Sequence, residues 1–545
     1  MENKTNYVSE VEEVINSKTT GIKQQTGGDV LLVSEEGLRK IPIPTDDPND
    51  PLNYSKWKKA GVVLTCCWFS PPETRLTGKS MTAIFSLLSL SGTGTFMQTL
   101  IQLYAPETDA HTVSNLSTYP TMVMAFGCLL FLPLSFVLGR RPVFIFVVIL
   151  ALITVITAGT SQNFQSHFIS KLFTGIATGA TESILPLIIS DVTFLSERSF
   201  YFGLYWSTQN CVNAALLISL SYLTAAAGWR WYYWLFAIAL GASLLLVIFL
   251  CPETRFARGL QALNGQAVYT DEFGATHILT DAEARERFGT VQAHTDTTTR
   301  KKTYLEELNP WSGITPEALK VLGRAFIKIG KSVSSPAVIF SLLASSISLG
   351  IAIGITLIYS TILEVEYHWS PASVGLFNAG IIPACFLAML YAGWCADKIN
   401  IWLAKRNGGV HKAEHHLIHM IVPGITGAIG IVLIAVCAHK PEKYSAWMMI
   451  VGWAIYEFSF TAILITTTTL AAETVPENPG AALVVVVGGK NLVSFGLSYG
   501  IIPMIFSMGY LRALMTLLGI FVGVFMLGVP VYFINPKWRK VAIKN

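Results

Sequence analysis

Two carboxylates stand inside long apolar stretches of this sequence, where a charge is costly. Glu182 lies near the middle of Ile169–Arg198, and Glu457 lies in WAIYEFSFTAILI. An ionisable group at bilayer depth costs about 2.5–3.5 kcal/mol or more, so it is a functional candidate by default. Such a carboxylate could exchange a proton or balance the charge of an organic cation. It could also be structural, hydrogen-bonded to backbone or hydroxyl groups.

Two lysines also lie in apolar stretches. Lys490, beside Asn491, is the cation deepest in such a stretch. Buried charges are usually matched, so we expect Lys490 to pair with Glu457 or Glu473; contact with an anionic substrate is the alternative. Lys171 is closer to the end of its stretch, from where its ammonium could reach the membrane interface.

Polar residues at helical spacing form two stripes. One consists of Trp206, Gln209 and Asn213, with Asn210 adjacent, and the other of Thr95, Gln98 and Gln102. Such stripes could line a cavity. They could also hold helices together by hydrogen bonds worth about 0.6 kcal/mol each. Two stripes together favour a cavity.

The composition places these residues in a membrane protein. The 545 residues are 52% hydrophobic and only 13% charged, whereas a soluble domain carries about 25% charge. The small net charge of +4 argues against a nucleic-acid surface. Eight cysteines show neither zinc-type spacing nor a secreted disulfide framework.

Long apolar runs predict the elements that position these residues, because a spanning helix needs about 20 apolar residues. After a first span, the runs are Tyr119–Leu138, Pro142–Gly159, Phe168–Ser190, Phe200–Ala226, Trp229–Leu250, Ala337–Leu363, Val374–Trp394, Leu417–Ala438, Ala446–Ala471, Ala481–Phe506 and Leu511–Ile534. The sequence therefore predicts an all-α membrane protein with twelve transmembrane helices in two sets of six. Gly175 and Gly179, at i and i+4, predict that a neighbouring helix lies close to the fourth span.

The start of the first span is irregular. Ala60–Phe69 is apolar but short, a polar segment follows, and Met81–Tyr104 could span alone. Either Ala60–Phe69 is an interfacial piece, or residues 71–85 are an insertion inside one span. Removing residues 71–85 would join the flanking runs, so a gene-model error such as a retained intron is one explanation of the insertion.

The polar segments complete the predicted domain organisation. Residues 1–59 are expected to be a disordered tail, 60–250 and 336–534 the two helical bundles, 251–335 a linker, and 535–545 a short tail. Lys and Arg concentrate in the loops after spans two and eight, which predicts that these loops and both termini are cytosolic. Asn115 then lies outside the cell in a glycosylation sequon, though close to the membrane.

Several motifs carry a family resemblance. They are Asp47–Lys59, Pro133–Val143, Lys171–Gly175, Asp191–Trp206, Gly228–Trp234, Pro252–Arg258, Gly393–Leu417 and Ala471–Leu483. With them the sequence resembles the major facilitator superfamily, and within it the fungal twelve-span drug:proton antiporter family. Within that family it also resembles the branch that contains fungal polyamine and organic-cation carriers. The resemblance implies two pseudo-symmetric bundles and a proton gradient, with no cofactor, as the energy source.

The resemblance also assigns expected roles. It implies a substrate or proton site at the bilayer midplane, between the halves. Its candidates are Glu182, Glu457, Lys171, Lys490, Gln98, Gln102, Trp206, Gln209, Asn213 and Asn491. Conformational-switch positions are expected at Gly139, Arg140, Arg141, Asp191, Glu197, Arg198, Asp397, Arg406, Glu414 and Glu473. The family position of Lys171 is associated with proton transfer, which is the alternative to its reaching the interface.

Two departures from the family pattern bear on coupling. Phe136 stands where the first cytosolic signature usually has an acidic residue, which weakens the expected charge relay between the halves. Asn210–Tyr222 lacks the Gly- and Pro-containing antiporter signature of the fifth span. These departures leave the direction of transport and its proton coupling open.

Two further groups of residues, one aromatic and one of histidines, are expected to have no direct role in transport. Tyr232, Tyr233 and Trp234 begin a span, where an aromatic belt is expected. His411, His415, His416 and His419 lie in a predicted cytosolic loop. No acidic or cysteine partner completes a site, so we predict no metal there and expect solvated or lipid-contacting histidines.

The leading functional prediction is proton-coupled efflux of a drug or secondary metabolite. Uptake of polyamines or other organic cations is the alternative, and a non-transporting membrane sensor is the alternative of another class. An enzyme is not expected, because the sequence has no nucleophile elbow, metal-binding His pair on a helix, or phosphate-binding Gly loop. The expected protein is a monomer that contacts lipid and a small molecule but no nucleic acid. It is placed in the plasma membrane, with the vacuolar membrane as the alternative.

Overall fold

The computed structural model describes the chain in segments. They are residues 30–31, 33–34, 37–38, 50–53, 92–105, 108–251, 253–254, 258–263, 266–270, 276–280, 317–475 and 479–542, and single positions 303, 306, 309, 313 and 315. Residues 60–91, with the predicted insertion at 71–85, lie outside the described residues.

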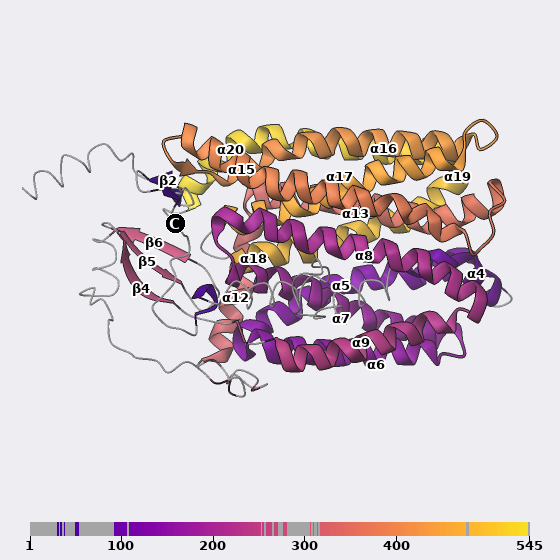
Figure 1. The fold of residues 1–545 in the computed structure, drawn as a ribbon, viewed down its shortest axis with the longest axis horizontal. Coiled ribbons are helices and arrows are strands. Elements are labelled where there is room, and N and C mark those ends of the chain that lie inside the picture. Colours follow the sequence, from indigo (N-terminus) through magenta and orange to yellow (C-terminus); the bar gives the residue numbers. More distant parts are fainter. Residues whose placement is uncertain are drawn as a thin grey trace, which may run out of the picture.

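The N-terminal half consists of long helices that run side by side (Figure 1). They are η2 (Gly92–Phe96), α4 (Met97–Tyr104), α5 (Ala110–Leu138), α6 (Arg140–Gly159), α7 (Phe164–Val192), α8 (Arg198–Ala227) and α9 (Arg230–Leu250). Gly139 separates α5 from α6 and Gly228 separates α8 from α9, with φ of 102° and 88°. Glycine is the residue that adopts such angles without strain, so these positions allow direct reversal of the chain.

The C-terminal half has the same build. Its helices are α13 (Pro336–Thr361), η4 (Ile362–Glu366), η5 (Val374–Gly380), α14 (Ile381–Ala388), η6 (Met389–Cys395), α15 (Ala396–Arg406), η7 (Ala413–Met420), α16 (Ile421–His439), α17 (Ala446–Thr474), α18 (Pro479–Leu483), η8 (Val484–Gly488), α19 (Gly489–Met526) and α20 (Gly528–Ala542). Pro336 at the first turn of α13 is favourable, because that position needs no N–H donor.

The described helices match the predicted spans. Ten of them, counted over the described residues, are long and apolar enough to cross a membrane, and the last covers Pro479–Arg539. This last one is interrupted at Gly509, where φ is 80° and ψ is 166°. The interruption divides it where the sequence predicts a boundary between two spans. The remaining predicted span, the first, begins outside the described residues.

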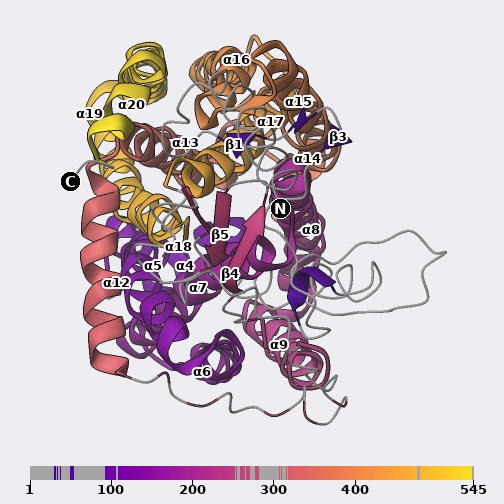
Figure 2. The ribbon, with the colours of Figure 1, turned by 90° about the vertical axis from the view of Figure 1, so that its left-hand side faces the viewer.

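Elements of the linker and the N-terminal region gather at one end of the helices, which we call the linker end (Figures 1 and 2). Strands β4 (Arg258–Leu263), β5 (Gln266–Thr270) and β6 (Thr276–Thr280) form an antiparallel sheet that the sequence did not predict. The helix α12 (Ala318–Val333) buries one face, which includes Val321, Ala325 and Ile329. The strand β1 (Val30–Leu31) pairs with β7 (Val410–His411), and β2 (Val33–Ser34) pairs with β3 (Gly37–Leu38).

The predicted close approach to the fourth span is confirmed. A Cβ atom on Gly175 would lie 2.5 Å from the carbonyl oxygen of Pro120, and one on Gly179 would lie 2.0 Å from that of Met124. Both oxygens belong to α5. The backbones of α5 and α7 therefore touch along the glycine face, which fixes the height of Glu182 in the bundle.

We expect Gly179→Ala to destabilise the protein by about 1–3 kcal/mol, the usual cost of overpacking. The added methyl group cannot be accommodated beside the Met124 carbonyl unless α5 shifts. The thermal unfolding midpoint of the purified protein measures the effect. Gly496→Ala is the matched control, because nothing lies within 4 Å of its Cβ position. Equal midpoints for the two variants would contradict the prediction.

The two halves contact each other at both ends. At the linker end, the Phe200 N–H donates to Asp397 Oδ2 over 2.9 Å. At the opposite end, Ser221 Oγ donates to the carbonyl oxygen of Ala372 over 2.9 Å, and the rings of Tyr119 and Tyr499 meet edge to face. Described residues of the two halves therefore touch near both ends of the helices.

Candidate functional site

Glu182 lies at a contact between the two halves. It projects from α7 and is 4% exposed. Its Oε1 accepts a hydrogen bond and ion pair from Lys490 Nζ, and its Oε2 accepts a hydrogen bond from Asn491 Nδ2 over 2.9 Å. Both partners belong to α19. A buried, hydrogen-bonded ion pair therefore joins the halves at this depth.

The partner of Lys490 was predicted wrongly. The sequence indicated Glu457 or Glu473, but the ammonium pairs with Glu182. Lys490 lies 308 positions from Glu182, and no local pattern connects them. The prediction that Lys490 is matched by a carboxylate is nevertheless confirmed.

Helix geometry prepares the Lys490 site. A π-helical segment, η8, immediately precedes α19 and so widens the helix just before Lys490. Single π-turns inside helices are frequent at functional sites. Close packing against α5 also fixes the position of Lys490 along the bundle, since a Cβ on Gly488 would lie 2.9 Å from Cys128 Cβ.

Trp206 continues the Lys490 site into α8. The ammonium of Lys490 lies 5.4 Å from the centroid of the Trp206 ring, a cation–π distance. The indole Nε1 donates to Thr468 Oγ1 of α17 over 3.1 Å. Four helices from both halves thus converge on one buried cluster, which we call the Glu182 cluster: Glu182, Trp206, Thr468, Lys490 and Asn491.

Glu457 has a different environment. It is 6% exposed on α17, and within the described part of the chain the structure records no hydrogen bond or ion pair to it. One turn later on the helix, Thr461 Oγ1 accepts from Asn210 Nδ2 of α8 over 2.9 Å and lies 3.6 Å from Cys385 Sγ. Glu457 is therefore a buried carboxylate near the contact of the halves, with no cation partner among the described residues.

Several buried amide oxygens around this contact also lack a donor. They are Gln209 Oε1, Asn213 Oδ1 and Asn491 Oδ1, judged among the described residues. A buried acceptor without a partner costs free energy comparable to a lost hydrogen bond. Ligand N–H groups or water molecules would satisfy these oxygens.

Lys171 does not reach the membrane interface. Its side chain is 0% exposed, and its ammonium lies 5.9 Å from the centroid of the Tyr233 ring. Tyr233 is also fully buried, and its hydroxyl lies 2.6 Å from His167 Nε2. The snorkelling interpretation of Lys171 is therefore wrong, as is the aromatic belt for Tyr232 and Tyr233.

His167 is a residue that the sequence analysis missed. Its Nδ1 lies 3.2 Å from the hydroxyl of Tyr104, and its ring stacks on Trp229. It lies four residues before Lys171 on α7, so helical spacing from that lysine could have indicated it.

The polar stripe of the first span is largely open in the described structure. Gln98 is half-buried and Gln102 is exposed on α4. Of the two predicted stripes, the one on α8 therefore supplies the buried polar groups.

The predicted switch residues lie at the linker end. Arg140 pairs with Asp191 at 3.5 Å, and Asp397 joins the halves through Phe200. Glu414 accepts hydrogen bonds from Asn535 and Arg539 of α20. Arg198 is buried and interacts electrostatically with Asp191 and Glu473. Glu197 and Arg406 are exposed, and the guanidinium of Arg406 covers Trp402.

Glu253 is a second residue that the sequence analysis did not select. Its carboxylate accepts from the backbone N–H groups of Arg140 and Arg141, over 3.0 and 3.3 Å, at the first turn of α6. A carboxylate there is favoured by the helix dipole.

Burial, and secondarily Glu253, raises the pKa of the Cys251 thiol to about 12, so the thiol stays protonated at neutral pH.

Phe136 makes an apolar contact between the halves. A Cβ on Gly480 of α18 would lie 2.9 Å from Phe136 Cζ. Phe136 belongs to a buried cluster that includes Ala481 of α18 and Val321 and Ala325 of α12. The phenyl ring of Phe136 therefore contacts the start of the eleventh span. In the family pattern an acidic residue usually stands at the position of Phe136.

The loop histidines were interpreted wrongly. His411, His415, His416 and His419 are buried, with exposures of 5, 6, 1 and 2%. An acidic partner does exist: Glu473 Oε2 lies 2.7 Å from His411 Nε2 and 3.0 Å from His416 Nε2. Glu473 lies at the end of α17, 62 positions from His411. Residue spacing in the sequence does not predict a contact over this separation.

Asn115 lies inside α5 and is half-buried, and its Oδ1 accepts from Thr118 Oγ1 over 3.4 Å. Glycosylation acceptors belong to surface loops, so this position counts against modification.

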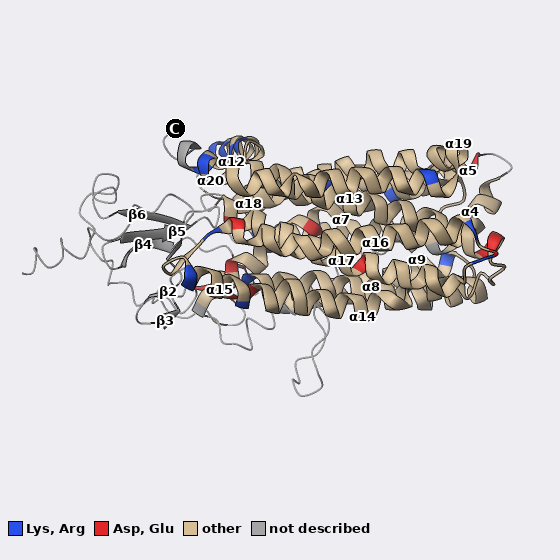
Figure 3. Ribbon diagram, turned by 90° about the horizontal axis from the view of Figure 1, so that it is seen from above, with Lys and Arg blue, Asp and Glu red and all other residues tan. Residues whose placement is uncertain are grey.

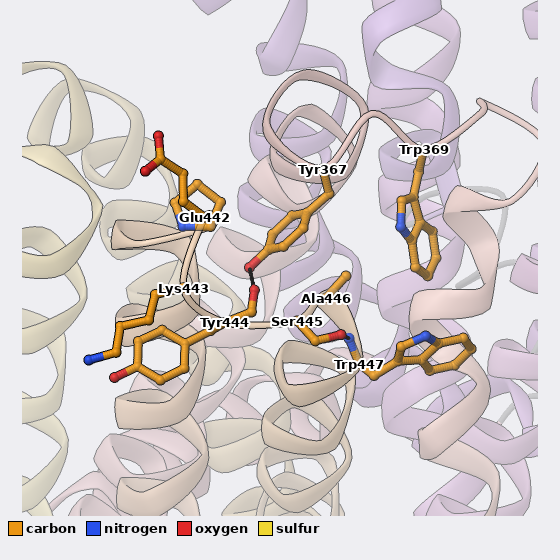
Figure 4. A pocket seen from close by; sticks show the side chains of 9 residues that line it. Tyr367, Trp369, Glu442, Lys443, Tyr444, Ser445, Ala446 and Trp447 are labelled. Atoms are coloured by element: carbon orange, nitrogen blue, oxygen red, sulfur yellow. Dashed lines mark hydrogen bonds between the residues drawn. The ribbon is translucent and has the colours of Figure 1, made fainter.

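A surface pocket lies at the end opposite the linker, within the C-terminal half (Figure 4). It is lined by Tyr367, Trp369 and the segment 441–447. The Tyr367 hydroxyl donates to the carbonyl oxygens of Cys437 and Tyr444, which ties the loops together. None of these residues belongs to the Glu182 cluster.

Comparisons with known proteins agree with this architecture. The family model of the Major Facilitator Superfamily matches residues 62–411. The uncharacterized MFS-type transporter C1271.10c of Schizosaccharomyces pombe is 22% identical over 421 residues, covering 72% of this chain and 70% of that protein. Multidrug transporter FLR2 of Candida glabrata is 27% identical over 237 residues, covering 41% and 37%. The solved proton:xylose symporter XylE matches with a TM-score of 0.53 at 14% identity, over 88% of this chain and 95% of that one.

Proposed function

Because the chain belongs to the major facilitator superfamily, and is thus a multi-pass membrane transporter of small molecules, we propose that it exports a drug or secondary metabolite in exchange for protons. The predicted major facilitator fold is confirmed. The multidrug designation of a relative from Candida glabrata supports efflux.

The observation that carries the proton coupling is Glu457. It is buried one helical turn from Thr461, which contacts Asn210 of the other half, and among the described residues no cation partner is recorded. A buried charge without a partner is expensive, so such a carboxylate either binds a proton or faces a cationic ligand. Alternate binding of proton and substrate at one carboxylate is the simplest exchange mechanism.

Uptake of polyamines or other organic cations is the second candidate. It is favoured by the amide oxygens of Gln209, Asn213 and Asn491, which have no donor among the described residues and would accept from ligand N–H groups. An ammonium facing Glu457 would complete such a site electrostatically.

The proposed orientation places the linker end in the cytosol. Lys and Arg gather there on α12, α15 and α20 (Figure 3), as the positive-inside rule requires of cytosolic loops. We place the protein in the plasma membrane, as a monomer, and the vacuolar membrane is the alternative location.

One experiment separates the two functions. Cells with and without the protein are compared for resistance to a panel of toxic compounds and for uptake of a labelled polyamine. Increased resistance with unchanged polyamine uptake supports efflux, whereas increased uptake supports the second candidate. Neither change, at normal surface expression, would favour a non-transporting sensor.

A further inference from the structure

The linker end of the C-terminal half contains a buried convergence of metal-ligand atoms. His411 Nε2, His416 Nε2 and Glu473 Oε2 all lie within 4.8 Å of one another. The histidines come from β7 and η7, and the carboxylate from the last turn of α17. We propose that these three residues bind a divalent transition-metal ion, with Zn²⁺ as the best chemical match.

The donor set fits zinc. Two imidazoles and one carboxylate form a known three-ligand Zn²⁺ set, with the fourth position left to water or another ligand. Bonds of about 2.0–2.1 Å at tetrahedral angles hold donor atoms about 3.3 Å apart. The nitrogens now lie 2.7 and 3.0 Å from the same carboxylate oxygen. Each nitrogen therefore needs to move away from the carboxylate oxygen by only a few tenths of an ångström, and the two nitrogens lie within 4.8 Å of each other.

A candidate outer-shell group lies beside His416, whereas beside His411 the described residues supply no acceptor. His411 Nδ1 is buried without a hydrogen-bond partner in the described structure, as is Nδ1 of the adjacent His415. A histidine that binds a metal through Nε2 carries its proton on Nδ1, and a neighbouring oxygen usually accepts it. The amide nitrogen of Asn400 lies 3.4 Å from His416 Nδ1, and its oxygen lies 3.1 Å from His419 Nε2. Rotation of this amide by about 180° would place the oxygen as that acceptor.

The position of the site implies a consequence for the halves. Arg198 of the N-terminal half interacts electrostatically with Glu473. A metal ion bound to Glu473 would neutralise the negative charge of this carboxylate, which now interacts with Arg198, using ligands from the C-terminal half alone. The strand β1 lies beside the site, because Val30 pairs with His411 in the backbone register. Metal binding would therefore fasten the loop to α17 and weaken one electrostatic contact between the halves.

The test uses the full-length protein, purified without a histidine tag and stripped with a chelator. Zn²⁺ affinity and stoichiometry are measured by competition with a chromophoric chelator. We expect one ion per chain. Because loss of an outer-shell group costs about 10–100-fold in affinity, His416→Gln and Glu473→Gln should each cost more than that, and Asn400→Ala should fall within it. His439→Gln is the matched control, because His439 is exposed at the other end of α16.

A second measurement does not depend on the stability of those variants. Co²⁺ added to the wild-type protein should give the visible absorption of a tetrahedral site, and His411→Cys should add a thiolate-to-cobalt charge-transfer band. No stoichiometric Zn²⁺ binding by the wild type, or binding that survives both ligand substitutions, would overturn the proposal. In that case the three residues form only a hydrogen-bonded contact. Transport need not be measured, so failure here leaves the proposed function standing.

Discussion

Lys490→Met should destabilise the protein by about 3–5 kcal/mol, the cost of leaving one partner of a buried ion pair uncompensated. Glu182 would keep its hydrogen bond from Asn491 but lose the ammonium. The halves would also lose an ionic contact between α7 and α19. We expect a lower thermal unfolding midpoint in detergent and a smaller monodisperse fraction in size-exclusion chromatography.

A double-mutant cycle isolates the ion pair from other effects of the substitution. Glu182→Gln with Lys490→Met removes both charges, so most of the lost stability should return. Arg512→Met is a control for removal of a cation from α19, because Arg512 lies beyond the Gly509 interruption. Additive destabilisation in the double variant would show that the two charges do not stabilise each other.

The same pair bears on transport, because it must change as the halves move. Alternating access rearranges one half against the other around a central site, and Glu182 and Lys490 lie on opposite halves. The double variant should therefore recover stability without recovering normal transport. Glu182→Gln with normal transport at normal surface expression would remove Glu182 from the mechanism.

The sequence predicted features that depend on local spacing. The glycines of α7 indicated a close helix contact because their spacing places both on one face, and α5 occupies that face. Apolar length located the spans, including the boundary near Gly509. Glu182, Glu457 and Lys490 stood out because a charge in an apolar run is unusual wherever it occurs.

What the sequence could not predict are contacts between distant segments. The pairing of Glu182 with Lys490 and the approach of Glu473 to His411 depend on how whole helices pack. Tyr233 illustrates the same limit, because an aromatic residue at a helix start can face lipid or the bundle. Here it faces His167 and Lys171, so it is buried. The sequence showed that Phe136 replaces an acidic residue of the family pattern. The apolar contact of its ring near Gly480 is visible only in the folded structure.

Glu457→Gln should abolish proton-driven transport without lowering stability. The amide has nearly the same shape, cannot exchange the proton, and removes a buried carboxylate that has no recorded cation partner among the described residues. The unfolding midpoint should therefore stay equal or rise. In proteoliposomes with an imposed pH gradient, accumulation of the substrate found in the cell assay should fall to that of protein-free liposomes.

Exchange of labelled for unlabelled substrate at equal pH separates coupling from binding. If Glu457 acts only as the proton site, this exchange persists in Glu457→Gln while gradient-driven accumulation is lost. If Glu457 instead faces a cationic substrate, both are lost together, because binding itself needs the carboxylate. Glu442→Gln is the control, since Glu442 is an exposed carboxylate at the end opposite the linker. Unchanged gradient-driven accumulation in Glu457→Gln would exclude both roles and transfer the coupling to another group, with the buried Lys171 and His167 the next residues to substitute.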